Sequence, residues 1–242
     1  MSTALLETVN LTKRFGGLVA VNKVNLKITP GETLGIIGPN GAGKTTLFNL
    51  IAGLLSPNEG KVYFKGKDIT NLLPHKRNEI GIARTFQIPR PFANMTVWDS
   101  VKVGAYRLTN DQKELERKVG EILEFFDLTR LAQQSCSSLN VSQLKLVELA
   151  RAVATGPELL LIDEVGAGLT PSELDDLGAM IQKLKRKMKI TICLVEHVMR
   201  IIWQLCPRIV VMDFGSIIST GTPKSVARDP KVIEAYLGRG LI

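Results

Sequence analysis

A glycine-rich turn limits what this chain can fold into more than any other feature of its sequence. Residues 38–45 read GPNGAGKT and fit the phosphate-loop pattern G-x-x-x-x-G-K-[ST]. An apolar strand is expected just before the turn, at 33–37, and a helix just after it, at 45–53. Small residues let backbone N–H groups surround a phosphate, and the N terminus of the helix attracts the anion. The turn therefore predicts a nucleotide-phosphate site, and a chance glycine-rich turn is the alternative.

Individual side chains of this turn carry distinct expectations. Lys44 is placed to reach the β- and γ-phosphates, and the hydroxyl of Thr45 is placed to bind Mg²⁺. The residues expected to contact the nucleotide are Gly38, Pro39, Asn40, Gly41, Ala42, Gly43, Lys44, Thr45 and Thr46.

A pair of carboxylates follows a second apolar run, at 159–162. Asp163 is expected to be a magnesium ligand, and Glu164 is placed to polarise an attacking water as a general base. Two adjacent carboxylates at a strand end repel each other, and a metal ion makes them tolerable. An exposed acidic pair at the end of a strand is the alternative.

The order of the expected elements indicates an α/β protein with an interruption. Strands are expected at 5–10, 21–28, 33–37, 61–64 and 80–86, then a mostly helical stretch from 97 to 154, and then alternating strands and helices from 159 to 212. Such alternation favours a parallel sheet that helices cover on both faces. The sequence predicts a P-loop NTPase core with a mainly parallel sheet, an N-terminal antiparallel β part and an inserted helical lobe. Residues 1–87 and 157–242 form the two parts of the core, and 88–156 form the lobe.

Composition excludes several classes of protein. The chain has 242 residues, 45% of them hydrophobic and 22% charged, which is typical of globular domains and not of disordered chains. Charged residues interrupt every apolar run before the ~20 residues that a membrane helix needs. The N-terminal residues lack a signal-peptide pattern, and three cysteines cannot all pair, so we expect a reduced compartment.

The net charge of +8 leaves nucleotides, nucleic acid and an anionic membrane open as partners. The basic run at 183–189 is read as the solvated C-terminal end of a helix, because cations are favoured there.

Further motifs, taken in order, resemble those of ABC-type ATPase subunits over nearly the whole chain. Phe15 matches the aromatic residue that stacks on adenine, although an apolar core residue is the alternative. Gln87 matches the glutamine that contacts Mg²⁺ or the attacking water, and a solvated glutamine is the alternative. His197 matches the switch histidine near the γ-phosphate, and residues 166–170 occupy the place of the loop that contacts the opposite subunit.

Local spellings narrow the resemblance to the ATP-binding subunits of high-affinity branched-chain (hydrophobic) amino acid importers. They are FGGLVAV at 15–21, RTFQ at 84–87, MTV at 95–97, EH at 196–197 and AYLG at 235–238. The resemblance implies ATP and Mg²⁺ as cofactors and a peripheral location on the cytoplasmic face of the membrane. It implies as partners a second ATPase subunit, two transmembrane permease subunits and, indirectly, an extracytoplasmic solute-binding protein, and it implies no nucleic acid.

The chain departs from the family at its second signature, Leu-Ser-Gly-Gly-Gln, which clamps the γ-phosphate of the opposite subunit. The aligned residues after Leu139 are Asn140, Val141, Ser142 and Gln143. Ser142 replaces the second glycine, so its Cβ opposes a close approach to phosphate and any positive φ that the loop needs. We therefore expect a heterodimer with one good site, and slow hydrolysis by this chain alone. Val165 and Thr170 are smaller departures, in place of a common Pro and of Asp or Asn.

The segment from Gln87 to Trp98 is apolar and broken by prolines, and it suits a groove for a helix of the membrane subunit. Ordinary lobe core is the alternative for Phe92 and Trp98.

Two other functions stay open. One is an ABC ATPase that acts on DNA or ribosomes, although such proteins commonly carry a coiled-coil insertion or two ATPase halves. The other is a GTPase or kinase, although the only Asn-Lys pair, Asn22-Lys23, precedes the phosphate loop.

Overall fold

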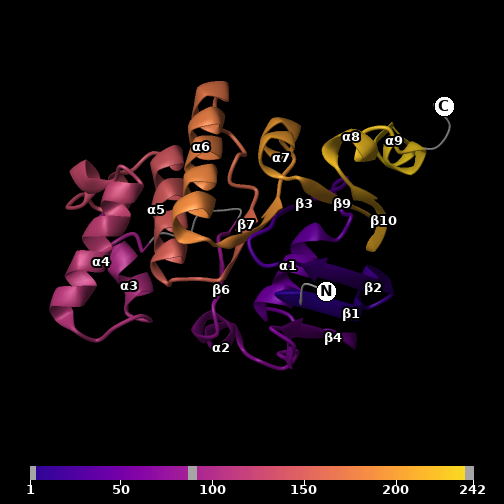
Figure 1. The fold of residues 1–242 in the computed structure, drawn as a ribbon, viewed down its shortest axis with the longest axis horizontal. Coiled ribbons are helices and arrows are strands. Elements are labelled where there is room, and N and C mark those ends of the chain that lie inside the picture. Colours follow the sequence, from indigo (N-terminus) through magenta and orange to yellow (C-terminus); the bar gives the residue numbers. More distant parts are fainter. Residues whose placement is uncertain (1–3, 87–91, 238–242) are drawn as a thin grey trace.

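The computed structural model describes residues 4–86 and 92–237, and these residues form two β-sheets with helices packed beside them (Figure 1). The larger sheet has the strand order β10-β9-β3-β8-β7-β6. Strands β9, β3, β8, β7 and β6 run parallel, and β10 is antiparallel to β9. Their bounds are Thr33–Ile37 for β3, Ile82–Arg84 for β6, Leu159–Asp163 for β7, Thr191–Val195 for β8, Arg208–Asp213 for β9 and Ser216–Gly221 for β10.

The smaller sheet is antiparallel and has the order β2-β1-β4-β5. Its strands are β1 (Leu6–Phe15), β2 (Leu18–Ile28), β4 (Glu59–Phe64) and β5 (Lys67–Asp68). Strands β1 and β2 are longer than the alternating apolar segments at 5–10 and 21–28 predicted. Register shifts between Thr8 and Arg14 interrupt the alternation but not the pairing, so the hairpin extends to Phe15 and Leu18.

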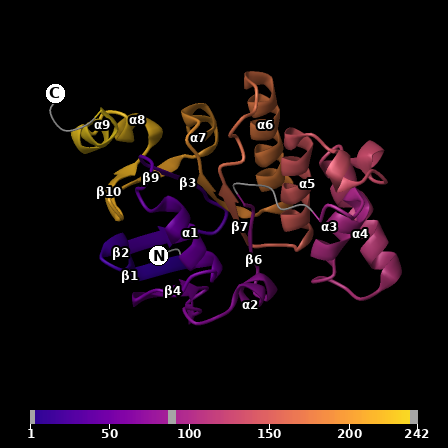
Figure 2. The ribbon, with the colours of Figure 1, turned by 180° about the vertical axis from the view of Figure 1, so that it is seen from behind.

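Alternation along the central strands divides the interior in two. Leu160 and Ile162 of β7 join the core that the helices of the larger group bury, whereas Leu159 and Leu161 join the core beneath the smaller sheet. The first core packs α6 (Pro171–Met188) and α7 (Met199–Leu205) on one face of the parallel sheet. The second packs α1 (Lys44–Ala52) on the other face, and Figure 2 shows this arrangement from behind. The predicted parallel sheet with helices on both faces is therefore confirmed.

The described part of the interval predicted to be a helical lobe is helical. It contains α3 (Val97–Ala105), α4 (Gln112–Phe125), α5 (Val141–Ala154) and two 3₁₀ turns, Thr129–Leu131 and Cys136–Ser138. Side chains cap the three α-helices: Thr96, Asp111 and Asn140 accept from the third backbone N–H of α3, α4 and α5. We keep the domain boundaries 1–87, 88–156 and 157–242 as a proposal.

Several elements differ from the sequence-based expectations. The strand expected at 80–86 is only β6, because α2 (Pro74–Glu79) ends just before it. The C-terminal elements α8 (Pro223–Val226) and α9 (Pro230–Leu237) were not predicted, nor was β10. The basic run closes α6 as expected, with Lys185, Arg186 and Lys187 in its last turn. The three cysteines are free and buried.

Arg77 of α2 lies buried at the C-terminal end of α1. Its guanidinium donates to the carbonyls of Leu50 at 2.6 Å and Ile51 at 2.7 Å, and to those of Thr70 and Leu72. These carbonyls solvate the cation, and the two from α1 belong to its last turn, where carbonyls lack the usual N–H donor four residues on. Burial lowers the pKa of Arg77 to about 10, so the side chain stays protonated at neutral pH.

In the part of the chain that the structure describes, none of the helices combines the length and the apolar character needed to span a bilayer.

Candidate functional site

The loop between β3 and α1 follows the predicted phosphate-loop geometry. Gly38, Gly41 and Gly43 have positive φ values of 153°, 80° and 98°. A Cβ on Gly38 would lie 2.1 Å from the carbonyl oxygen of Met212, and one on Gly43 would lie 2.2 Å from that of Ala20. Only glycine fits either position, so the loop is held in shape by the strands behind it. Gly43 precedes α1, and among the described residues no side chain caps this N terminus.

Lys44 is buried and already bound within this loop. Its Nζ donates to the carbonyl oxygens of Gly38 at 2.7 Å and Pro39 at 2.9 Å. Burial lowers the pKa of Lys44, and the nearby carboxylates of Glu164 and Asp163 oppose that shift. The ammonium is thus held at the loop by weak neutral acceptors that a phosphate can replace.

A cavity of about 890 Å³ opens beside the loop and collects residues from distant parts of the chain. Its wall includes seven of the nucleotide contacts predicted in this turn, Asn40, Gly41, Ala42, Gly43, Lys44, Thr45 and Thr46. The β1–β2 hairpin contributes Phe15 and Leu18, and the turn between β9 and β10 contributes Phe214. Phe15 is 47% exposed, so it is not a core residue. Gly38 and Pro39 approach this site through their bonds to Lys44.

Two residues at the strand ends complete the cavity wall. Glu164, directly after β7, and His197, two residues after β8, both line it. His197 Nε2 lies 2.8 Å from Glu164 Oε1. The backbone N–H of Glu164 donates to the carbonyl of Val195 at 2.9 Å, which fixes the two strand ends together.

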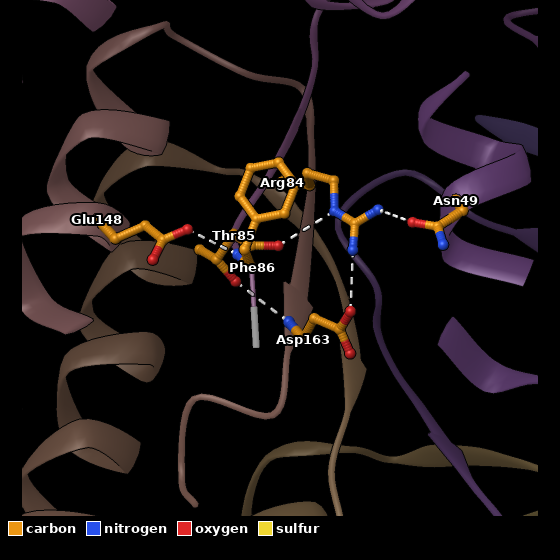
Figure 3. A network of polar contacts seen from close by, with 6 residues as sticks. All are labelled: Asn49, Arg84, Thr85, Phe86, Glu148 and Asp163. Atoms are coloured by element: carbon orange, nitrogen blue, oxygen red, sulfur yellow. Dashed lines mark hydrogen bonds and ion pairs between the residues drawn. The ribbon is translucent and has the colours of Figure 1, made fainter. Parts of the chain in front are cut away.

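Asp163 is buried against Arg84, as Figure 3 shows. Arg84 Nη2 lies 2.9 Å from Asp163 Oδ2, and its Nη1 donates to Asn49 Oδ1 of α1 at 2.6 Å. Thr85 Oγ1 accepts from the backbone N–H of Asp163 at 3.1 Å. Burial raises the pKa of Asp163, and the charge of Arg84 opposes that shift.

The other carboxylate oxygen of Asp163 is placed so that it could bind a cation. Oδ1 is buried, and within the described residues nothing donates a hydrogen bond to it. A buried acceptor without a donor suits a cation or its water shell. In 4–86 and 92–237 no cluster of three or more His, Cys, Asp or Glu side chains is placed to hold a metal. Such sparse protein ligation, from one carboxylate and the Thr45 hydroxyl, fits Mg²⁺, which keeps waters and phosphate oxygens. Gln87, the third predicted ligand, lies outside the described residues.

Comparison with known proteins identifies the fold and the family. The sequence pattern of the ABC transporter family matches residues 21–167, which is more than half of the chain. This chain belongs to the ABC transporter family. A second pattern, that of the branched-chain amino acid ATP-binding cassette transporters, matches residues 216–241.

Relatives of this ABC transporter chain match it over nearly its full length. The high-affinity branched-chain amino acid transport ATP-binding protein BraF of Pseudomonas aeruginosa is 39% identical and is matched over 98% of this chain and 99% of its own. A nucleotide-free ATP-binding cassette from an ABC transporter is 36% identical, with a TM-score of 0.89 over 98% of this chain and 100% of that one. The dimeric ATP-binding cassette MJ0796, bound to ADP and Pi, is 27% identical, with a TM-score of 0.80 over 90% and 98%.

The degenerate ABC signature lies at the N terminus of α5. Asn140 Oδ1 accepts from the backbone N–H of Gln143 at 2.9 Å and from Ser142 Oγ at 3.0 Å, while Gln143 Oε1 accepts from the N–H of Asn140. Val141 is exposed. Ser142 is not among the residues with positive φ, so the expected conflict between its Cβ and a left-handed backbone is wrong for this conformation. In this conformation the segment is the first turn of α5, and the expected effect of the Ser142 Cβ on a close approach to phosphate stays a prediction.

Sequence reasoning missed four residues of the site: Arg84, Asn49, Phe214 and Glu148. Arg84 stands in the segment RTFQ, which was read for its glutamine and for its family resemblance and not for a contact with Asp163. Glu148 of α5 accepts from the backbone N–H of Phe86 at 2.7 Å, which ties the helix to the residue before Gln87 (Figure 3). Phe214, exposed on a two-residue turn, carried no signal.

Proposed function

We propose that this chain is the ATP-binding and hydrolysing subunit that energises an importer of branched-chain or other hydrophobic amino acids. The observation that carries the proposal is a single cavity that brings together Lys44, Glu164 and His197. The ATPase activity follows from membership of the ABC family. The solute class rests on the names of relatives that match the whole chain and on the second pattern at 216–241.

Each residue has a role that follows from its position. Phe15 offers an exposed aromatic face for adenine, and the Lys13 ammonium lies 5.3 Å from its ring centroid. Lys44 exchanges its two carbonyl acceptors for phosphate oxygens. Asp163 Oδ1 and the Thr45 hydroxyl would hold Mg²⁺, which neutralises developing phosphate charge when it is bound.

Glu164 is the proposed general base. His197 orients its carboxylate through the 2.8 Å contact and is itself exposed to the cavity, where a terminal phosphate is expected. Gln87 keeps its predicted role at the metal or the water.

The chain is proposed to work as one half of a heterodimer. Asn140, Val141, Ser142 and Gln143 form a hydrogen-bonded helix start, and none of them lines the cavity, so this chain does not complete its own site with them. A partner ATPase with an intact signature supplies that part. The Ser142 hydroxyl and the Gln143 backbone N–H both donate to Asn140 Oδ1, which leaves fewer free donors for the partner's nucleotide. The dimeric relative with ADP and Pi supports association of two such subunits.

Two permease subunits are the proposed membrane partners, with an extracytoplasmic binding protein acting through them at the cytoplasmic face of the membrane. Phe92 and Met95 are exposed, and so are Val103, Tyr106 and Leu108 on and after α3. Trp98 instead packs against the lobe core, as its alternative reading had it. Phe92, stacked 4.8 Å from the Arg151 guanidinium, is the residue to test for the groove.

Co-purification from membranes tests the proposal directly. We expect the chain to bring down a second ATPase subunit and two permeases, and hydrolysis to rise when the partner ATPase is added. Phe92→Ala should reduce assembly with the permease, while Leu73→Ala, an exposed apolar control just before α2, should not. Fast turnover by the lone chain that no partner raises would contradict the heterodimer, and assembly unaffected by Phe92→Ala would contradict the groove.

A further inference from the structure

Two buried side chains of opposite charge form hydrogen bonds with the loop of residues 165–170, between β7 and α6. Lys145 of α5 donates through Nζ to the carbonyl oxygen of Val165 at 2.9 Å and to that of Ala167. Glu196 accepts through Oε1 from the intervening N–H of Gly166 at 2.6 Å. Three consecutive residues of the loop are thus bonded alternately to a cation from the helical group and an anion from the sheet.

The carboxylate of Glu196 also bonds to its own segment. It accepts from the backbone N–H groups of His197 and Val198, just after β8. One side chain therefore joins the turn that carries His197 to the 165–170 loop. Glu196 is 1% exposed, so the loop N–H and these two N–H groups share a carboxylate that water does not reach.

Packing leaves little freedom at this junction. A Cβ on Gly166 would lie 3.1 Å from Glu196 Oε1 and from Leu174 Cδ2, and 3.2 Å from Ile201 Cδ1. A bulkier residue would push the loop away from the carboxylate. The charged groups that face Glu196 are Glu164 from the end of β7 and Lys145 from α5, and burial raises the pKa of Glu196 to about 7.

The same two segments also meet at the cavity, where His197 contacts Glu164. The contact between His197 and Glu164 is accessible from the cavity, whereas the hydrogen bond between Glu196 and Gly166 is buried. A phosphate that displaces His197 therefore acts on the loop through a bond that it cannot itself reach.

We propose that Glu196 is a positioning residue that makes the 165–170 loop follow His197, with Lys145 connecting the same loop to the signature helix α5. The inference rests on the proposed place of His197 at the terminal phosphate. Glu196 touches neither nucleotide nor reacting atoms, so it acts only through the turn and the loop. By this route, occupancy of the cavity reaches the residues that are expected to face the opposite subunit.

Hydrogen exchange on the nucleotide-free chain tests the contact between Glu196 and the 165–170 loop. Glu196→Gln keeps the size of the side chain but replaces one accepting oxygen with an NH₂ group, which cannot accept a hydrogen bond from these backbone N–H groups. We expect exchange of the peptide covering 164–170 to become at least tenfold faster, and that of α1 (44–52) to stay unchanged. Glu158→Gln, an exposed glutamate in a surface ion pair with Lys65, is the matched control. Unchanged exchange at 164–170, or equal acceleration in both peptides, would overturn the proposal, since the second result marks general loosening.

A non-hydrolysable ATP analogue tests whether the loop follows the site. In the wild type the analogue should change exchange in both the phosphate loop and the 164–170 peptide, and in Glu196→Gln only in the phosphate loop, with analogue affinity within twofold. In the complex with the partner ATPase, kcat should fall at least tenfold with KM within twofold, and Glu196→Asp should recover part of kcat. A variant whose 164–170 peptide still responds to the analogue refutes the inference. Absence of any response in the wild-type phosphate loop would instead refute the nucleotide site.

Discussion

Replacing Arg84 with methionine should destabilise the protein strongly, because it strands the carboxylate of Asp163 in the interior. The two side chains are 8% and 1% exposed, and their closest atoms lie 2.9 Å apart. Removing one partner of a buried pair costs ~3–5 kcal/mol, since the remaining charge is buried away from water and has lost its hydrogen-bonded counter-ion. Against a typical total of ~5–15 kcal/mol this is a large share, and it corresponds to a fall in Tm of roughly 6–20 °C for a chain of this size.

The pH dependence of this loss has a definite sign. Burial already raises the pKa of Asp163, and Arg84 opposes that rise. Without Arg84 the folded-state pKa rises further above the unfolded value. A carboxyl with a raised folded pKa stabilises the fold fully below its unfolded pKa and loses that contribution as the pH rises through the folded pKa. The deficit of Arg84→Met should therefore be larger at pH 8 than at pH 5.

Urea unfolding followed by tryptophan fluorescence, with EDTA present, measures the effect. The control is Arg117→Met, which breaks the exposed pair with Glu121, 60% and 58% exposed, and should cost less than about 1 kcal/mol. In an Asp163→Asn background the penalty of Arg84→Met should shrink, because no buried charge remains. A loss below about 1 kcal/mol at pH 8, or an equal loss with Asn at 163, would refute the reasoning.

Three further predictions concern the site and its surroundings. Lys44→Ala should weaken ATP binding by about 10- to 150-fold in a fluorescent-nucleotide titration, because it removes a charge-assisted hydrogen bond worth ~1.5–3 kcal/mol; affinity within twofold would contradict the proposed contact. Restoring the signature with Asn140→Ser, Val141→Gly and Ser142→Gly together should raise the steady-state ATPase rate of the lone chain about tenfold or more, and no rise would show that the signature is not what limits it. Glu196→Gln should flatten the pH dependence of the unfolding free energy between pH 5 and 8. Because the pKa of Glu196 is raised to about 7, its stabilising contribution of about 3 kcal/mol is present in acid and is lost as the pH rises through 7. An unchanged slope would contradict that pKa.

The parts of this fold that could be predicted from the sequence are those where the local residue pattern matches the place of the element in the fold. The apolar runs at 33–37 and 159–162 became central strands because they are buried on both faces. The glycines of the phosphate loop have positive φ, and Gly38 and Gly43 also leave no room for a Cβ. The antiparallel hairpin was underestimated since its bulges break the alternation that marks a strand. Short elements such as α2 and α8 depend on tertiary packing, and the hydrophobic periodicity of the local sequence does not reveal that packing.

Site residues divide in the same way. Lys44, Glu164 and His197 were predictable because each sits at a fixed place relative to a strand end. Arg84 was not, because its role depends on β6 lying next to β7, where Arg84 pairs with Leu161 two residues before Asp163. Glu196 was quoted only as a neighbour of the histidine, and its bond to Gly166 links positions 30 residues apart.

The buried guanidinium of Arg77 neutralises one end of the dipole of α1, the nucleotide-binding helix. A permanent cation is lodged against the carbonyls of Leu50 and Ile51, so the negative pole of α1 is compensated inside the protein before any ligand arrives. The opposite pole faces the phosphate loop uncompensated. A helix of only nine residues can therefore present an unbalanced positive end to an incoming anion, whether or not a metal accompanies it.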